Sequence, residues 1–345
     1  MTKHFDMKRR EFLNRAVIAA ITAPSSLSVS AAAQLQPRKL KANALADFSL
    51  QASSIERLHS VVVSSAGEVV LSRAFRGPAT DRAVNIKSVS KSLVATLTGA
   101  AQQHGFIESV EQTIGELAPE LIPKRSDPRV AKLALVDLLT MRAGLERVSG
   151  PAYGRWINST NWVNYVLTRP FIAEPGTRML YSTGDTHVLG AVLSNLTGKS
   201  LHSLSNSWLG KPLGINFPPW TRDPQGYYLG GNEMSLSPEH LVKVGELYLN
   251  SGSHKGSQIL PVGWVEQAFT ARTHSPFSGD GYGYGWFKRD FGGVTSAYAR
   301  GFGGQVMHVV PELDLVVAIT SDTTKPARSH GYMKVLHNLV EQHLV

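Results

Sequence analysis

The sequence predicts an α/β protein of the α+β kind, in which one antiparallel sheet is flanked by terminal helices and carries an all-helical insert. Runs rich in β-branched residues lie near both ends of the chain, whereas residues 106–275 are dominated by helical patterns such as LALVDLLTMRAGL. Strands from the two ends must then meet in one sheet, with the helices inserted between them. We therefore expect a discontinuous sheet domain of residues 34–98 and 276–345, and an insert of residues 99–275.

The first part of the sheet domain is predicted to be a hairpin followed by a helix. Leu58–Ser64 and Glu68–Phe75 are β-rich and flank Ala66-Gly67, after a polar linker. Ser88–Gln103 has apolar residues at helical spacing, and Gly105 is expected to end this helix.

The last part of the chain returns to strands. The apolar alternation predicts strands at Tyr282–Lys288, Gly293–Ala299, Gln305–Val310 and Leu315–Ser321, and then a closing helix at Arg328–Leu344.

Composition restricts the classes of function. The 345 residues are 42% hydrophobic and carry a formal net charge of +9, of which +3 lies in residues 1–33. The remaining charge is scattered without basic runs, so we do not expect nucleic acid as a partner. The absence of cysteine excludes disulfides and thiolate catalysis, and it suits an oxidising compartment.

Residues 1–33 are typical of an export signal. Arg9-Arg10 precedes a short apolar stretch, and Ala31-Ala32-Ala33 forms a small-x-small cleavage pattern. The arginine pair resembles a twin-arginine signal, so we expect the export machinery as a partner, cleavage near Ala33 and a periplasmic location. The apolar stretch is too short to span a bilayer, and no other segment is predicted to do so.

Ser88 and Lys91 form an S-x-x-K tetrapeptide at the start of the predicted helix. Both side chains would lie on one helix face, where an amine could take a proton from a hydroxyl. A serine that caps the helix and a solvated lysine would give the same pattern. About one such match is expected by chance in a chain of this composition, so the tetrapeptide alone does not decide.

Two further stretches extend the pattern. Tyr181-Ser182-Thr183 lies before a predicted helix, and YARGFGGQ lies in a Gly-rich turn between strands. With LLTMRAGL (138–145), PGTRMLYSTGD (175–185) and YGYGW (282–286), the chain resembles the serine β-lactamase and penicillin-binding superfamily from about residue 50 to its end. More narrowly, it resembles the esterase and class C-like branch, which includes 6-aminohexanoate-dimer hydrolases.

The resemblance implies a β-lactamase-like fold and a serine hydrolase that needs no cofactor or metal. It implies Ser88 as the nucleophile, Lys91 as its base and Tyr181 as a proton carrier. It also implies an oxyanion site made by the backbone N–H groups of Ser88 and Phe302. Substrate contacts are expected at Gly301, Phe302, Thr183 and Asn232.

The chain departs from the family pattern at two motifs. Thr183 stands where the family usually has Asn, and Ala299-Arg300-Gly301 aligns with a motif that usually begins with a Lys or His cation. The missing cation argues against penicillins and cephalosporins as the main substrate. Because strand neighbours point to opposite faces, we expect Arg300 to face away from the site.

These residues predict hydrolysis of a small ester or linear amide through an acyl-enzyme. A true β-lactamase or D-Ala carboxypeptidase remains an alternative, as does a non-catalytic binding or sensing protein on the same fold. No G-x-S-x-G or H-E-x-x-H occurs, which disfavours an α/β-hydrolase and a zinc hydrolase. We expect His187 to be a core or surface residue and Asp185 to be a helix cap.

Overall fold

The structure is a computed structural model in which residue 40 and residues 42–326 and 331–345 are described. Residues 37–345 belong to one compact unit. The predicted signal peptide, residues 1–33, and the first residues of the predicted closing helix from Arg328 lie outside the described residues.

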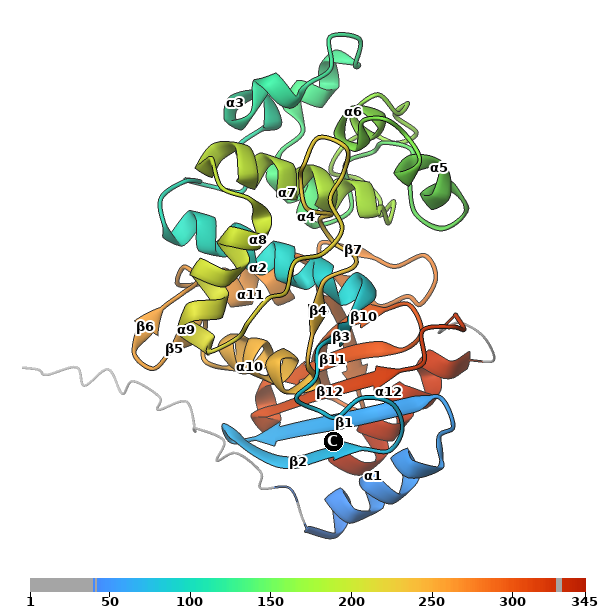
Figure 1. Cartoon of the computed structure of the whole chain (residues 1–345). Helices are drawn as coiled ribbons and strands as arrows, with labels where there is room; N and C mark the ends of the chain where they lie inside the picture. The colour runs from blue at the N-terminus through green and yellow to red at the C-terminus, as the bar shows by residue number, and fades with distance from the viewer. Residues whose placement is uncertain (1–39, 41, 327–330) are drawn as a thin grey trace, which may run out of the picture. The chain divides into compact units, whose positions relative to one another are not determined.

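An eight-stranded sheet combines strands from both ends of the chain, and the strand pairs are antiparallel. Its order is β2-β1-β12-β11-β10-β9-β8-β7, so the N-terminal hairpin pairs with the last strand of the chain (Figure 1). The strands are β1 (Leu58–Ser65), β2 (Glu68–Ala74), β7 (Thr273–His274), β8 (Gly281–Tyr282), β9 (Phe287–Phe291), β10 (Val294–Gly301), β11 (Gln305–Val310) and β12 (Leu315–Ser321). Short two-stranded sheets pair β3 (Val84–Asn85) with β4 (Ser235–Leu236) and β5 (Ser253–His254) with β6 (Ser257–Gln258).

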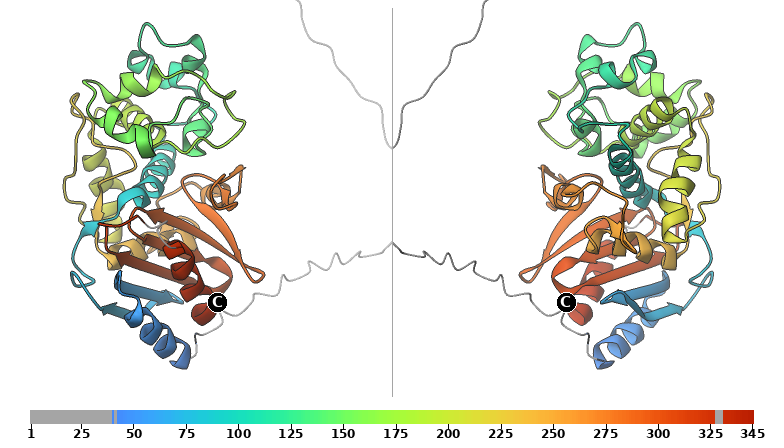
Figure 2. Two further views of the ribbon diagram at one scale, coloured as in Figure 1. Left: turned by 90° about the vertical axis from the view of Figure 1, so that its right-hand side faces the viewer. Right: turned by 90° about the vertical axis from the view of Figure 1, so that its left-hand side faces the viewer.

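Both faces of the sheet are covered by helices, as the side views of Figure 2 show. Leu315, Val317 and Ile319 of β12 pack with α1 (Ala42–Ser54) and α12 (Tyr332–Leu344) on one face. The alternate residues Val316 and Ala318 pack on the other face, with α10 (Pro238–Leu249) and α2 (Ser90–Gln103). This alternation is the period-2 pattern of a strand buried on both sides.

Helix α2 lies between the sheet and the helices of the middle segment (Figure 1). Its residues Ser90–Ala101 are all buried, which fixes the position of the residues just before it. The other helices are α3 (Ile114–Leu117), α4 (Leu135–Leu139), α5 (Tyr153–Ile157), α6 (Trp162–Leu167), α7 (Thr183–Thr197), α8 (Leu201–Leu204), α9 (Lys211–Leu213) and α11 (Trp264–Phe269).

Three segments differ from the sequence-based expectation. Residues 99–275, expected to be an all-helical insert, also contain the short strands β4 to β7, and β7 belongs to the main sheet. Helix α1 occupies residues that we expected to be a polar linker, and it packs through Phe48 and Ala52 against the sheet and α12. The strand expected at Tyr282–Lys288 is instead two strands, β8 and β9, joined by a tight turn at residues 283–286. Gly285 has a φ of +76° there, a backbone conformation that favours glycine.

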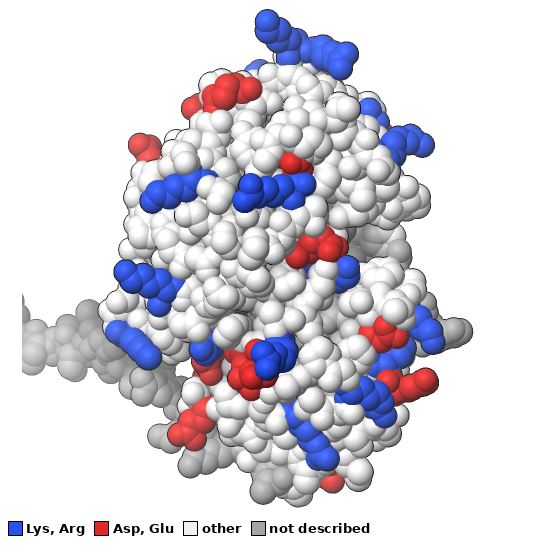
Figure 3. All heavy atoms as spheres, in the orientation of Figure 1, with Lys and Arg blue, Asp and Glu red and all other residues white. Residues whose placement is uncertain are grey.

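Lys, Arg, Asp and Glu side chains are scattered over the face of the molecule shown in Figure 3, with uncharged surface between them. Among the described residues, no helix is both long and apolar enough to cross a membrane.

Candidate active site

Ser88 lies in a short 3₁₀ turn, Lys87–Val89, that leads directly into α2. The preceding residue, Lys87, has a φ of +52°, which is uncommon for a residue with a side chain. Asn85 holds this turn, because its Oδ1 accepts a hydrogen bond from the Lys87 N–H at 2.9 Å. The Lys87 ammonium and the Asn85 amide both donate to the carboxylate of Glu233, at 3.1 and 2.6 Å. These contacts therefore hold the backbone just before Ser88 in place.

The end of strand β10 lies against the same turn. A Cβ at Gly301 would stand 2.5 Å from the carbonyl oxygen of Ile86 and 3.1 Å from the amide nitrogen of Ser88. Only a residue without a side chain permits this close approach. The following residue, Phe302, has a side chain that is 48% exposed. The oxyanion role inferred for the Phe302 N–H stays a prediction.

Lys91 is buried, with 1% of its surface exposed, and its Nζ has three oxygen neighbours. Nζ lies 3.1 Å from Ser88 Oγ, 3.1 Å from Thr183 Oγ1 and 2.7 Å from the carbonyl oxygen of Gly231. A neutral amine has two N–H donors and one lone pair. The carbonyl of Gly231 and the hydroxyl of Thr183 can take the two donors, which leaves the lone pair for the proton of Ser88.

Burial lowers the pKa of Lys91 from 10.5 to about 7, because the protein interior disfavours the ammonium form. The nearby carboxyl of Asp185 acts in the opposite direction. Asp185 lies in the first turn of α7, is itself buried, and accepts a hydrogen bond from the side chain of Ser182. Burial raises the pKa of Asp185 to about 8, while Ser182 and Lys91 lower it. The charges of the two groups thus act on each other: the carboxylate raises the pKa of Lys91, and the ammonium lowers the pKa of Asp185.

Tyr181 is the third residue of the candidate reacting group, beside Ser88 and Lys91. Burial raises the pKa of its phenol, and a side-chain hydrogen bond with Ser88 acts against this shift. Nζ of Lys91 lies 5.1 Å from the centre of the Tyr181 ring. The ring is held by Tyr282 and Phe287, whose ring centres lie 6.4 and 6.3 Å away. The structure thus brings together the hydroxyl, the amine and the phenol that the sequence singled out.

Thr183 lies next to the amine. Besides its contact with Lys91, its hydroxyl lies 2.9 Å from Ser149 Oγ, and its backbone N–H donates to the same oxygen at 2.7 Å. Ser149 was not singled out from the sequence, because it lies in a loop 34 residues before Thr183. Thr183 therefore holds Lys91, and the substrate contact inferred for it stays a prediction.

The guanidinium of Arg300 lies over the ring of Phe287. Its neighbour Gly301 faces the Ser88 turn, and strand alternation does separate the two residues. However, the long Arg300 side chain places its guanidinium 4.3 Å from the centre of the Phe287 ring, and its charge lowers the pKa of the Tyr181 phenol. A positive charge is thus present near the reacting groups, although the aligned cation position is occupied by Ala299.

The remaining predicted residues lie around this group. Asn232 follows Gly231, donates to the Tyr153 hydroxyl at 2.9 Å, and has a buried amide oxygen without a partner among the described residues. Its substrate contact stays a prediction. His187 is fully buried and pairs with Asp223 at 3.1 Å, so the expected core histidine is confirmed. The Gly230 N–H donates to His187 Nδ1, which ties the Gly231 loop to α7.

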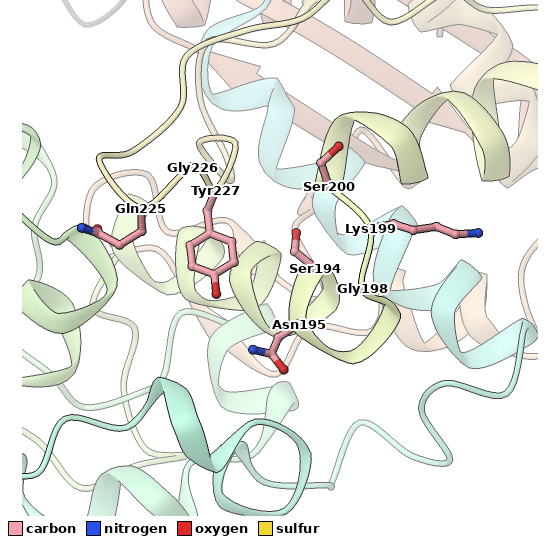
Figure 4. A pocket seen from close by; sticks show the side chains of 8 residues that line it. All are labelled: Ser194, Asn195, Gly198, Lys199, Ser200, Gln225, Gly226 and Tyr227. Atoms are coloured by element: carbon pink, nitrogen blue, oxygen red, sulfur yellow. The ribbon is translucent and has the colours of Figure 1, made fainter.

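Two cavities lie near the two ends of α7. One, of about 400 Å³, lies at the end of α7 between residues 194–200 and 225–227, and contains none of the three reacting groups (Figure 4). The other, of about 240 Å³, is lined in part by Tyr181. Within the described part of the chain, no group of three His, Asp or Glu side chains is arranged to hold a metal ion.

Comparisons with known proteins show which family the chain resembles in sequence and in fold. The sequence model of the Beta-lactamase family matches residues 59–342. The 6-aminohexanoate-dimer hydrolase of Paenarthrobacter ureafaciens is 25% identical over 289 residues, which cover 77% of this chain and 73% of that protein.

Solved structures show the same fold. A Beta-Lactamase/D-Alanine Carboxypeptidase from Pseudomonas syringae has a TM-score of 0.69 and 16% identity, over 88% of this chain and 100% of that one. EstCE1, described as a hydrolase with promiscuous acyltransferase activity, has a TM-score of 0.70 and 19% identity, over 88% and 98% of the two chains. From the family match over residues 59–342, together with the fold, we conclude that this chain belongs to the Beta-lactamase family, whose relatives named here are hydrolases.

Proposed function

We propose that this protein is a serine hydrolase that cleaves a small carboxylic ester or a linear amide through an acyl-enzyme on Ser88. The observation that carries the proposal is the contact of 3.1 Å between Ser88 Oγ and the buried amine of Lys91, whose pKa is lowered to about 7. A serine hydroxyl becomes a useful nucleophile only when a nearby base takes its proton, and a pKa of about 7 lets a large fraction of this amine be neutral near neutral pH.

The acylation step follows from the contacts. Lys91 takes the hydroxyl proton as Ser88 Oγ bonds to the substrate carbonyl carbon. The bond from that carbon to the leaving oxygen or nitrogen then breaks, and Tyr181 gives its proton to the leaving group and recovers one from Lys91. This step converts the ester or amide substrate into a free alcohol or amine and an acyl ester on Ser88.

Deacylation returns the enzyme to its starting state. Water donates a proton to the Tyr181–Lys91 pair while its oxygen attacks the acyl carbon. The bond to Ser88 Oγ breaks, Ser88 recovers the proton, and the carboxylic acid leaves. The hydrogen bond between Ser88 and Tyr181 gives this proton a short path.

Two findings favour an ester or linear amide over a β-lactam. The aligned cation position is occupied by Ala299, which is 99% buried and offers no charge. The relative from Paenarthrobacter ureafaciens is named for a 6-aminohexanoate dimer as its substrate. Rates on p-nitrophenyl acetate, a linear amide and nitrocefin should be compared for the wild type and Ser88→Ala. We expect Ser88-dependent cleavage of the ester, with slow or absent nitrocefin turnover. A dominant nitrocefin activity would instead favour a β-lactamase.

We also propose export to the periplasm through the twin-arginine pathway, on the basis of Arg9-Arg10 and the Ala31–Ala33 pattern. Expression of the full chain and of the Arg9→Lys/Arg10→Lys variant, followed by fractionation, tests this. The wild type should appear in the periplasm with a new N-terminus near residue 34, and the variant should stay uncleaved. Equal export of both would contradict the proposal.

A further inference from the structure

Strand β2 (Glu68–Ala74) forms one outer edge of the eight-stranded sheet, and β7 (Thr273–His274) forms the other (Figure 1). The two edges differ in length, because β7 has two residues and β2 has seven. Natural sheets usually shorten an edge strand or place Pro or Lys in it, since an open edge can pair with another chain. The sequence of β2, EVVLSRA, contains neither residue, and six of its seven residues are exposed. Strand β2 is thus a long edge without the usual protection.

The outer side of β2 carries free backbone groups. The N–H of Phe75 donates to the carbonyl oxygen of His59 in β1 at 2.7 Å, so the backbone of Phe75 points toward β1. Successive residues of an antiparallel strand point alternately toward and away from one neighbour. The N–H and C=O groups of Ala74 and Ser72 therefore point away from β1. Among the described residues, these groups have no backbone partner on that side.

Side-chain contacts hold β2 in position from both faces of the sheet. Ser72 Oγ lies 2.7 Å from Thr80 Oγ1 and donates at 3.2 Å to Glu239 of α10, the helix that covers one face. Arg73 donates at 3.0 Å to Ser49 of α1, which covers the other face. Because the strand is already held extended, it loses little conformational entropy when another strand pairs with it.

The charges of this edge are arranged so that it fits a second copy of itself. Glu68 lies at the start of β2, whereas Arg73 and Arg76 lie near and just beyond its end. Among the described residues, none of these three forms an ion pair. In an antiparallel pair of copies, each Glu68 approaches the basic end of the partner strand, whereas a parallel pair would place like charges opposite each other. Pairing would also cover part of Val69 and Val70, which are 54% and 39% exposed.

We propose that two copies of this chain pair through β2, antiparallel and around a two-fold axis near Ser72. The N–H and C=O of Ser72 in each copy would bond to the same groups of Ser72 in the other, and the two sheets would become one. A single pair of short strands buries a small area, so we expect a weak dimer with a Kd of about 1–100 µM. This inference does not depend on the proposed hydrolysis, because β2 lies at the opposite side of the sheet from β8, whose Tyr282 contacts Tyr181.

Sedimentation velocity at protein concentrations from about 1 to 500 µM tests the proposal. We expect the wild type to change from monomer to dimer over this range. Val70→Lys places a charge in the edge and should raise the Kd by about 10-fold or more. Val262→Lys is the control, because Val262 is 91% exposed in the turn before α11, and it should keep the wild-type Kd. Both variants should keep the wild-type thermal unfolding and ester hydrolysis. A wild type that stays monomeric, or an unchanged Kd in Val70→Lys, would overturn the proposal.

Cross-linking tests the orientation of the pair. The chain contains no cysteine, so an introduced thiol reports one position. In Ser72→Cys the two thiols of a dimer would face each other, since paired residues of this kind have Cα atoms about 5.5 Å apart. A short bis-maleimide should therefore link Ser72→Cys to itself about 10-fold faster, or more, than it links Glu68→Cys or Val262→Cys. The two copies of Glu68 lie at opposite ends of an antiparallel pair.

Two results of this experiment would overturn the proposal. Equally fast linking of Glu68→Cys and Ser72→Cys would indicate a parallel pair. Linking of Ser72→Cys only to a different protein, when the reagent is added to a cell extract, would indicate that another partner occupies the edge.

Discussion

Lys87 and Glu233, which are 146 residues apart in sequence, form an ion pair of 3.1 Å beside Ser88, and both have a positive φ. Two residues with side chains in this backbone region are each costly by about 1 kcal/mol or more. The pair, together with Asn85, holds the Lys87–Val89 turn in the conformation that presents the hydroxyl of Ser88 to Lys91.

Glu233→Gln should therefore lower kcat more than it lowers stability. The charge of the pair is lost while the shape of the side chain is kept, so the turn loosens, and we expect kcat to fall by about 10-fold or more. Steady-state kinetics and thermal unfolding check this. Glu174→Gln is the control, because it removes a similar contact, 3.0 Å to Arg129, away from the site. An unchanged kcat in Glu233→Gln would show that the turn does not need the pair.

On the acid side of the pH–rate profile, the activity should follow the protonation of the Lys91 amine. The amine must be neutral to act as a base, so kcat/KM should rise with pH and level off above an apparent pKa of about 7. Lys91→Met should lose this activity. A flat profile between pH 5 and pH 9 would contradict the role of Lys91.

Asp185→Asn should move this limb to lower pH. The carboxyl of Asp185 raises the pKa of Lys91, so its removal leaves burial to lower that pKa further. The neutral amide can still accept the hydrogen bond from Ser182. A pH profile of the variant measures the shift directly, and a shift to higher pH would show that Asp185 does not act on Lys91 through its charge.

Tyr181→Phe should lower kcat by about 10²- to 10⁴-fold, the usual contribution of one general acid–base group. Tyr282→Phe is a matched control, because its ring lies next to Tyr181 and its buried hydroxyl has no hydrogen-bond partner among the described residues. We expect Tyr282→Phe to keep near wild-type kinetics. Similar losses in both variants would indicate that ring packing, and not proton transfer, explains the effect.

Gly301→Ala should reduce activity by displacing the Ser88 turn. The new methyl group would stand 2.5 Å from the carbonyl oxygen of Ile86, which is too close for a backbone contact. Gly154→Ala, on α5, meets nothing within 4 Å and should keep full activity, with stability raised by up to about 1 kcal/mol. Kinetics and thermal unfolding of both variants check this. A wild-type kcat in Gly301→Ala would mean that the close approach of β10 does not fix the position of the Ser88 turn.

The strands that the sequence predicted best are those with strong local signals. Gln305–Val310 and Leu315–Ser321 have the expected bounds, since each is a continuous apolar run in a hairpin. Helix α1 was missed because its apolar face contains few residues and is defined by its packing on the sheet and on α12. The segment 282–288 alternates like a strand, but Gly285 instead turns the chain against α2, where its carbonyl accepts from Ser92 at 2.6 Å.

The candidate site shows the same division. Ser88, Lys91 and Tyr181 were predictable because they lie in short motifs with a fixed spacing. The contacts of Glu233 and Ser149 with the motifs were not, because only the fold brings these residues there from distant segments. The contact of Arg300 with Phe287 could not be predicted, because alternation fixes the direction of a Cβ and not the end of a long side chain.

The central proposition is that Ser88 carries the acyl group, and mass spectrometry of the quenched enzyme tests it most directly. After mixing with p-nitrophenyl acetate and rapid acid quenching, intact protein should gain one acetyl group, and peptide mapping should place it on Ser88. Lys91→Met should form this adduct far more slowly. An acetyl group on another residue, or steady hydrolysis by Ser88→Ala at the wild-type rate, would contradict the mechanism.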